Sequence, residues 1–91
     1  MTSIRIRPRA SSEIDELADY IARDSVSAAM RFLDALQKTF DVIGERPGIG
    51  SLRFAHLPML KGLRVLAVHG FENHLVFYIE RTSYVDVLRA A

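Results

Sequence analysis

The stretch from Ser12 to Gly50 limits the possible folds of this chain more than any other part of the sequence. It contains two amphipathic helical patterns, interrupted only at Asp24-Ser25 and closed by a turn-forming run that starts at Glu45. The periodic segments that follow have the alternation of β-strands. We therefore expect a helical hairpin that packs on one face of a small sheet, where both can bury their apolar sides.

The first helical pattern has the spacing of three and four residues that places apolar side chains on one face. Its members are Ile14, Leu17, Ala18, Ile21 and Ala22. We predict that this helix begins at Ser12, whose hydroxyl can accept a hydrogen bond from the first turn. Asp15 would reach back to complete a shortened capping box.

The second helical pattern has an apolar stripe wider than a small domain needs. The stripe consists of Ala29, Phe32, Leu33, Leu36, Phe40 and Ile43, widened by Val26, Met30 and Val42. Two interpretations are open: the first helix and the sheet bury the extra width, or it forms a groove for a helix of a partner. Gly44 and Pro47 should end this helix, Gly44 by adopting a left-handed backbone and Pro47 by disfavouring helix at Arg46.

Length, charge and composition narrow the function. Ninety-one residues predict one domain, and the absence of cysteine excludes thiol chemistry and disulfides. Twelve basic and eleven acidic side chains give a net charge of +1, too balanced for a protein that binds nucleic acid directly. No apolar run approaches the 20 or so residues that span a membrane, so we expect a soluble, cytoplasmic protein.

Strand character appears in four segments, residues 4–7, 63–69, 74–80 and 84–89. The first alternates and stops at Pro8, and the last three are joined by the short connections 70–73 and 81–83. The predicted fold is therefore α+β: an N-terminal strand, a helical hairpin, then a three-stranded antiparallel meander, with the helices on one face of the sheet. The other face should be open, and Arg64, Tyr78, Arg81 and Arg89 should gather on or near it, either as a solvated face or as a binding surface.

Motifs of catalysis are missing. The three histidines, His56, His69 and His74, have no spacing typical of metal ligands, and no nucleophile elbow, phosphate loop or dinucleotide fingerprint is present. We therefore expect no metal, no cofactor and no catalytic residue. One enzymatic alternative is a metal-free ribonuclease that uses Arg64, Tyr78, Arg81 and a histidine, although the lysines that such sites carry are lacking.

The order of elements, together with particular residues, resembles the RelE/ParE superfamily of bacterial toxins, and the ParE branch in particular. The matching segments are residues 13–22, 29–36, 46–50, 62–66, 74–78 and 85–89, which together span nearly the whole chain. No single segment is diagnostic, but their ordered set is.

The resemblance implies a toxin of a type II toxin-antitoxin system that inhibits DNA gyrase by binding, without catalysis. It also implies a cognate ParD-like antitoxin whose disordered C-terminal segment folds onto the toxin by helix-in-groove docking or strand addition at the open edge of the sheet. The expected antitoxin-binding residues are Met30, Leu33, Leu36, Phe40, Ile43, Arg64 and Leu66. Those expected to serve target binding or toxicity are Arg64, Tyr78, Arg81 and Arg89.

Two alternatives follow from the same resemblance. The chain ends at Arg89-Ala90-Ala91, where ParE sequences commonly continue into a tail with a histidine. One alternative is therefore a truncated, inactive toxin that still binds antitoxin. The other is a RelE-like endoribonuclease that cuts mRNA on the ribosome.

Overall fold

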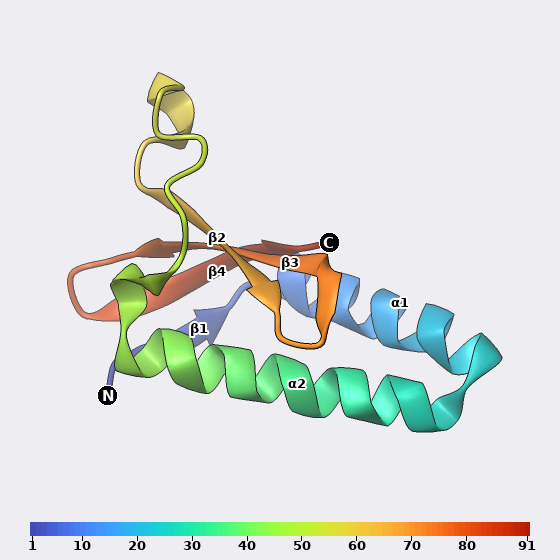
Figure 1. The fold of residues 1–91 in the computed structure, drawn as a ribbon. Helices are drawn as coiled ribbons and strands as arrows, with labels where there is room; N and C mark the ends of the chain where they lie inside the picture. Colours follow the sequence, from blue (N-terminus) through green and yellow to red (C-terminus); the bar gives the residue numbers. More distant parts are fainter.

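The structure, a computed structural model, describes residues 1–91 and contains four strands and two long helices. The elements in chain order are β1 (Ser3–Ile6), α1 (Pro8–Asp24), α2 (Val26–Glu45), the 3-10 turns η1 (Pro47–Ile49) and η2 (Pro58–Leu60), β2 (Leu63–Val68), β3 (Phe71–Glu80) and β4 (Tyr84–Ala90). Figure 1 shows that both helices lie on the same side of the sheet. The predicted α+β order is confirmed.

The four strands form one mixed sheet in the order β1-β4-β3-β2. β2, β3 and β4 form the predicted antiparallel meander, and β1 joins the edge of β4 in parallel, with Ile4 opposite Val85 and Ile6 opposite Val87. The helical crossover between β1 and the meander allows this parallel pairing. The N-terminal strand thus becomes one edge of the sheet, and β2 becomes the other.

The core lies between the sheet and the helical hairpin. Twelve buried side chains form one cluster: Ala10, Ile14, Phe32, Leu36, Phe40, Ile43, Val68, Val76, Tyr78, Val85, Val87 and Ala90. The helical members recur at spacings of three and four, as the apolar periodicity predicts. In the strands, Val76 and Tyr78 are two residues apart, as are Val85 and Val87, so each pair shares one face of the sheet. The core faces of the two helices were therefore readable from the sequence, whereas the alternation of the strands did not show which of their faces the helices would cover.

The start of α1 differs from the prediction. The helix begins at Pro8 rather than Ser12, and Arg7 precedes it with an extended backbone and no side-chain cap. Proline fits the first helical position because its fixed φ suits a helix and its missing N–H would be unpaired there in any case. Pro8 therefore opens the helix, and the capping box of Ser12 and Asp15 does not form because both lie within it.

The break between the helices is as predicted, but the end of α2 has a different cause. Ser25 caps α2 with its hydroxyl, which accepts from the backbone nitrogen of Ala28 at 3.0 Å. Gly44 lies inside the helix and has no left-handed backbone. A Cβ on Gly44 would lie 3.2 Å from the carbonyl oxygen of Thr2, so this glycine permits the N-terminus to approach the helix closely. The helix continues to Glu45 and stops before Pro47.

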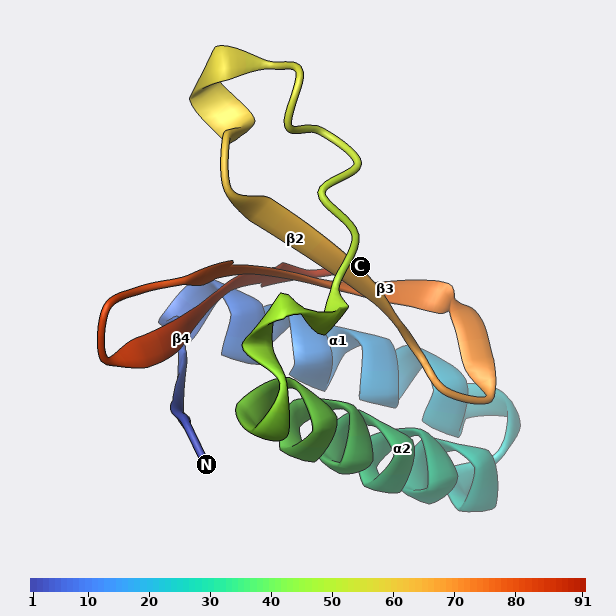
Figure 2. The same ribbon diagram turned by 60° about the vertical axis from the view of Figure 1, so that its left-hand side comes forward.

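The connection between β2 and β3 is shorter than predicted. β3 begins at Phe71 instead of His74, which leaves only His69 and Gly70 between the strands. Gly70 has φ +82°, a left-handed conformation that favours glycine and allows the tight turn. The segment between η1 and β2 is longer and stands away from the sheet on the side opposite the helices, as Figure 2 shows.

Candidate partner-binding site

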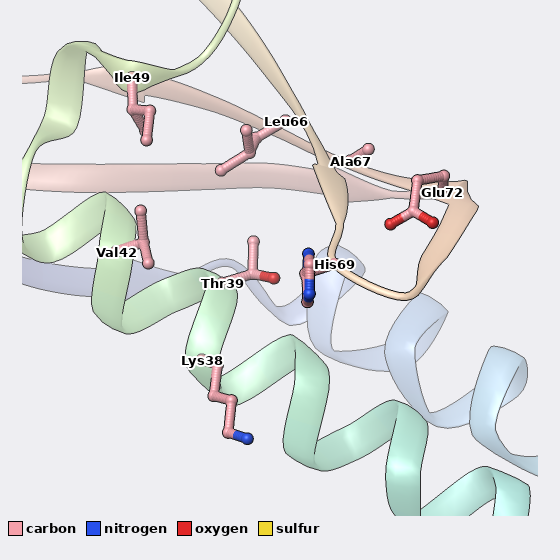
Figure 3. A pocket seen from close by; sticks show the side chains of 8 residues that line it. All are labelled: Lys38, Thr39, Val42, Ile49, Leu66, Ala67, His69 and Glu72. Carbon is pink, nitrogen blue, oxygen red and sulfur yellow. The ribbon is translucent and has the colours of Figure 1, made fainter.

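An open groove lies between the second half of α2 and strand β2 (Figure 3). It has a volume of about 370 Å³. The lining residues are Lys38, Thr39 and Val42 from α2, Ile49 from η1, Leu66 and Ala67 from β2, His69 from the following turn and Glu72 from β3. Two stretches of the chain, residues 38–49 and 66–72, therefore meet around this groove.

Apolar side chains form the walls of the groove. Val42 and Ile49, which line the groove together with Leu66, remain 37% and 38% exposed. His69 adds an imidazole on the side of the groove nearer Glu72, and Lys38 adds an ammonium group from α2 (Figure 3). An apolar groove with a polar rim that the protein's own chain leaves uncovered is typical of a site for a partner segment.

Tyr78 holds the turn that carries Ile49. Its side chain is fully buried, and its hydroxyl accepts from the backbone nitrogen of Gly50 at 2.8 Å and donates to the carbonyl oxygen of Pro47 at 2.7 Å. Burial raises the pKa of this hydroxyl, an effect that the hydrogen bond from Gly50 opposes. The proton needed for the bond to Pro47 is therefore retained at neutral pH.

Arg64 reinforces the same turn from β2. Its guanidinium donates to the carbonyl oxygens of Gly48 at 3.1 Å and Gly50 at 2.8 Å. Ser51 then exchanges two backbone hydrogen bonds of 2.9 Å with Val65. We call this set of contacts, made by Tyr78 and Arg64 to residues 47–50 together with the Ser51–Val65 pair, the clamp. The clamp fixes the wall of the groove that Ile49 provides.

The residues predicted to bind antitoxin lie in three different environments. Leu36, Phe40 and Ile43 are at most 7% exposed and belong to the core. Met30 and Leu33 are 63% and 43% exposed but do not line the groove. Since Met30 precedes Val42 by twelve residues, the two lie about a third of a turn apart around the helix. Leu66 is in the groove, and Arg64 acts from behind it through the clamp. The wide stripe thus combines a core face with exposed flanks.

The four polar residues predicted to gather on the open side are instead dispersed, and this expectation was wrong. Tyr78 points into the core, and Arg64 binds the clamp. Arg81 pairs with Asp86 at 3.0 Å, and Arg89 pairs with Glu13 of α1 at 2.6 Å. Arg64 pairs with Tyr78 across β2 and β3, so it shares a face of the sheet with a core residue. Strand alternation alone could not tell which face the helices would cover.

Sequence reasoning did not single out Asp86. This carboxylate is 4% exposed and receives hydrogen bonds from Arg7 at 3.0 and 2.8 Å and from Arg81 at 3.2 and 3.0 Å. The hydrogen bonds from Arg7 lower the pKa of Asp86, which burial alone would raise, and Arg81 lowers it further. The available signal was an acidic residue between two valines in a strand. The Arg7–Asp86 pair links the junction of β1 and α1 to β4.

One edge of the sheet is partly covered by the chain itself. The bonds between Ser51 and Val65 occupy the outer edge of β2 at its centre. Strand addition along all of β2, one of the two docking modes expected, would have to displace Ser51. The end of β2 at Ala67, which lines the groove, remains available.

The imidazoles are also separate. His56 is exposed in the segment between η1 and η2, and His69 borders the groove. His74 packs edge-on against Phe32 with ring centroids 5.2 Å apart, and its Nδ1 is buried without a partner. No group of three or more histidine, aspartate or glutamate side chains is placed to hold a metal ion.

Comparison with known proteins identifies the family. Residues 4–90 match the family model of the ParE toxin of the type II toxin-antitoxin system parDE. The chain belongs to this family. The match extends from β1 to the end of β4, so the groove, the clamp and the Asp86 pairs all lie within the ParE toxin domain. No curated protein matches the chain.

Membership in the ParE family gives the protein its general role. It is the toxin of a type II toxin-antitoxin system, and such a system implies an antitoxin partner. Neither helix has the length and apolar character required to cross a membrane. The open groove is the feature of this ParE-family structure best suited to a partner segment.

Proposed function

We propose that this ParE-family toxin inhibits DNA gyrase in the cytoplasm by binding it, and that a ParD-like antitoxin neutralises it. The observation that carries the proposal is the open apolar groove on a clamped framework, in a chain of this toxin family. A preformed groove lowers the cost of ordering the partner and suits recognition by contact.

The antitoxin segment is an amphipathic helix that places its apolar face against Val42, Ile49 and Leu66. An acidic residue near one end of that helix would pair with Lys38 on the rim. A segment that continues around α2 would reach Leu33 and Met30, which are exposed. Folding on binding would cost conformational entropy, but it would let the segment wrap around a large part of the toxin surface. A segment that is disordered when free is also open to proteolysis, which would allow regulation.

The placement of the polar residues supports action without catalysis. A metal-free ribonuclease needs a base, an acid and cations that converge on one phosphate. Here Tyr78 is buried, and its hydroxyl already accepts one hydrogen bond and donates another. Arg64 is bound to the turn in the clamp, and Arg81 is paired with Asp86. These three groups face different parts of the molecule, so the RelE-like endoribonuclease is the weaker alternative.

Supercoiling by purified gyrase tests the proposal. Added toxin is expected to inhibit supercoiling in proportion to its concentration, and prior mixing with antitoxin is expected to prevent inhibition. Absence of inhibition at toxin excess would contradict the proposal. Codon-specific mRNA cleavage in a translation extract would favour the endoribonuclease, and normal growth on expression of the toxin alone would favour an inactive toxin that only binds antitoxin.

A further inference from the structure

The segment that projects from the sheet between η1 and β2 contributes little to the fold. We call residues 52–61 the arm. Nine of its ten side chains are exposed, and Phe54 alone is half-buried. Its backbone hydrogen bonds are local: Ala55 to Leu52, Leu57 to Phe54, Leu60 to Leu57 and Lys61 to Pro58. No hydrogen bond or ion pair joins the arm to the helices or the sheet. Figures 1 and 2 show that it stands away from the sheet.

Large apolar side chains are nevertheless concentrated on the arm. Met59 is 97% exposed, and Leu52, Leu57 and Leu60 are 44%, 41% and 37% exposed. The part of their apolar surface that remains in water contributes nothing to folding, and exposed apolar clusters of this kind mark sites of interaction. The arm therefore has the composition of a surface that another molecule covers.

The base of the arm is held by the rest of the protein, although its tip projects away from the sheet. The clamp holds the chain up to Ser51, where the arm departs, and Gly62 turns it back into β2 with φ +85°. Pro58 and the 3-10 turn of η2 restrict the tip. A projection on a fixed base loses less conformational freedom on binding than a flexible loop does.

The charges around the arm indicate the chemistry of its partner. Arg53 and Lys61 flank the apolar tip, and the sequence contains no acidic residue from Pro47 to Phe71. Two arms packed against each other would bring like charges together, which disfavours pairing of two copies through their arms. The arm carries only two permanent charges and has no tryptophan or tyrosine. It is therefore poorly suited to bind a nucleic acid or a membrane. A different protein, with an apolar pocket and an acidic rim, fits best.

We propose that the arm is the surface with which this toxin grips its target protein, by inserting Leu57 and Met59 into an acid-rimmed apolar pocket. This inference rests on the proposed function, because it assumes that the toxin acts by binding a protein. The arm rises on the side of the sheet away from α2, and the groove lies against α2, so target and antitoxin occupy different surfaces. Neutralisation then requires the bound antitoxin to obstruct the approach of the target.

The test compares a double variant, Leu57→Ser with Met59→Ser, with wild type and with the control Tyr20→Ser. Tyr20 is 66% exposed on α1 and has no part in the groove or the arm. All three proteins should unfold at the same temperature, since the substituted side chains are exposed. The concentration of the arm variant that gives half-inhibition of supercoiling is expected to be at least about tenfold that of wild type. Its affinity for the purified antitoxin should be unchanged.

The outcomes separate this inference from the proposed function. If wild type inhibits gyrase and the arm variant inhibits equally, the inference fails and the proposed function stands. If wild type does not inhibit gyrase, the proposed function fails, and the role of the arm is then tested by growth arrest on expression. If the arm variant no longer arrests growth but still binds the antitoxin, the inference is supported. If the arm variant arrests growth as wild type does, the inference is overturned. Loss of antitoxin binding by the arm variant would also overturn it, as would arm-dependent binding of wild type to duplex DNA or to anionic lipid vesicles.

Discussion

The hydroxyl of Tyr78 lies 2.8 Å from the backbone nitrogen of Gly50, a residue 28 positions earlier in the chain. This bond joins the C-terminal half of β3 to the turn that follows α2 and leaves no space for a side chain at Gly50. A Cβ there would lie 2.7 Å from the Tyr78 hydroxyl and 3.0 Å from the Cβ of Arg64. The backbone of Gly50 has an ordinary φ of −67°, so close approach rather than backbone conformation requires glycine.

Gly50→Ala should therefore destabilise the protein by about 1–3 kcal/mol, because the added methyl group pushes the turn away from Tyr78. Gly48→Ala is the matched control in the same turn, since a Cβ at Gly48 would meet nothing closer than the Arg64 guanidinium at 3.8 Å. Urea unfolding of both variants provides the measurement. Equal stability of the two would show that the clamp does not constrain this turn.

The Asp86 pair predicts a pH dependence of stability. Its folded pKa is lowered, chiefly by the hydrogen bonds from Arg7, whereas an unfolded aspartate has a pKa of about 3.9. The stabilisation is therefore complete above about pH 4 and is lost as the pH falls through the folded pKa. Asp86→Asn should cost about 1–3 kcal/mol at pH 7.

Urea unfolding at a series of pH values measures this effect. The difference between wild type and Asp86→Asn should be constant from pH 7 to about 5 and should shrink below about pH 4. Asp19→Asn, which removes an exposed carboxylate of α1, serves as the control for net charge. A difference that stays constant down to pH 2 would refute the role assigned to the Arg7 and Arg81 pairs.

Removing the hydroxyls of Ser25 and Ser12 tests which of these two residues caps a helix. Ser25→Ala should lower stability by about 1 kcal/mol because the hydroxyl caps α2. Ser12→Ala should leave stability within about 0.5 kcal/mol, since Ser12 is exposed within α1, where alanine is favoured. Thermal unfolding compares the two, and a larger loss at Ser12 would restore the predicted helix start.

Much of the fold could be predicted from periodicity, and the errors have local causes. The stripes of α1 and α2 identified the core faces of the helices, and the alternation located the strands without showing which of their faces the helices cover. Pro8 misled because the same residue can end a strand or open a helix. Gly44 misled because a glycine can serve close packing as well as a turn, and only the position of Thr2 reveals which.

The site was less predictable than the fold. Leu66 was identified, but the groove also depends on Val42, Ile49 and His69, which come together only when four elements are placed. Arg81 and Arg89 seemed available for a target, but each is paired with a carboxylate. Arg81 pairs with Asp86 across a turn, and Arg89 pairs with Glu13, which is distant in the sequence. Pairings of this kind depend on strand register, which sequence patterns alone do not determine.

The groove assignment predicts the effect of a charge on antitoxin binding. Ile49→Glu places a carboxylate in the apolar wall and should weaken binding of the antitoxin at least tenfold, with little loss of stability because Ile49 is 38% exposed. Val26→Glu, at an exposed position of α2 outside the groove, is the control. Isothermal titration of the two variants is the measurement. Weakening by Val26→Glu alone would place the antitoxin on the opposite flank of α2.

The central claim is that this toxin acts by reversible binding and changes no covalent bond in its target. Recovery of gyrase after inhibition tests this most directly: gyrase is first inhibited by toxin, and excess antitoxin is then added to remove the toxin from it. Supercoiling activity should then return to the level of untreated gyrase. Activity that stays lost after the toxin has been removed would contradict it.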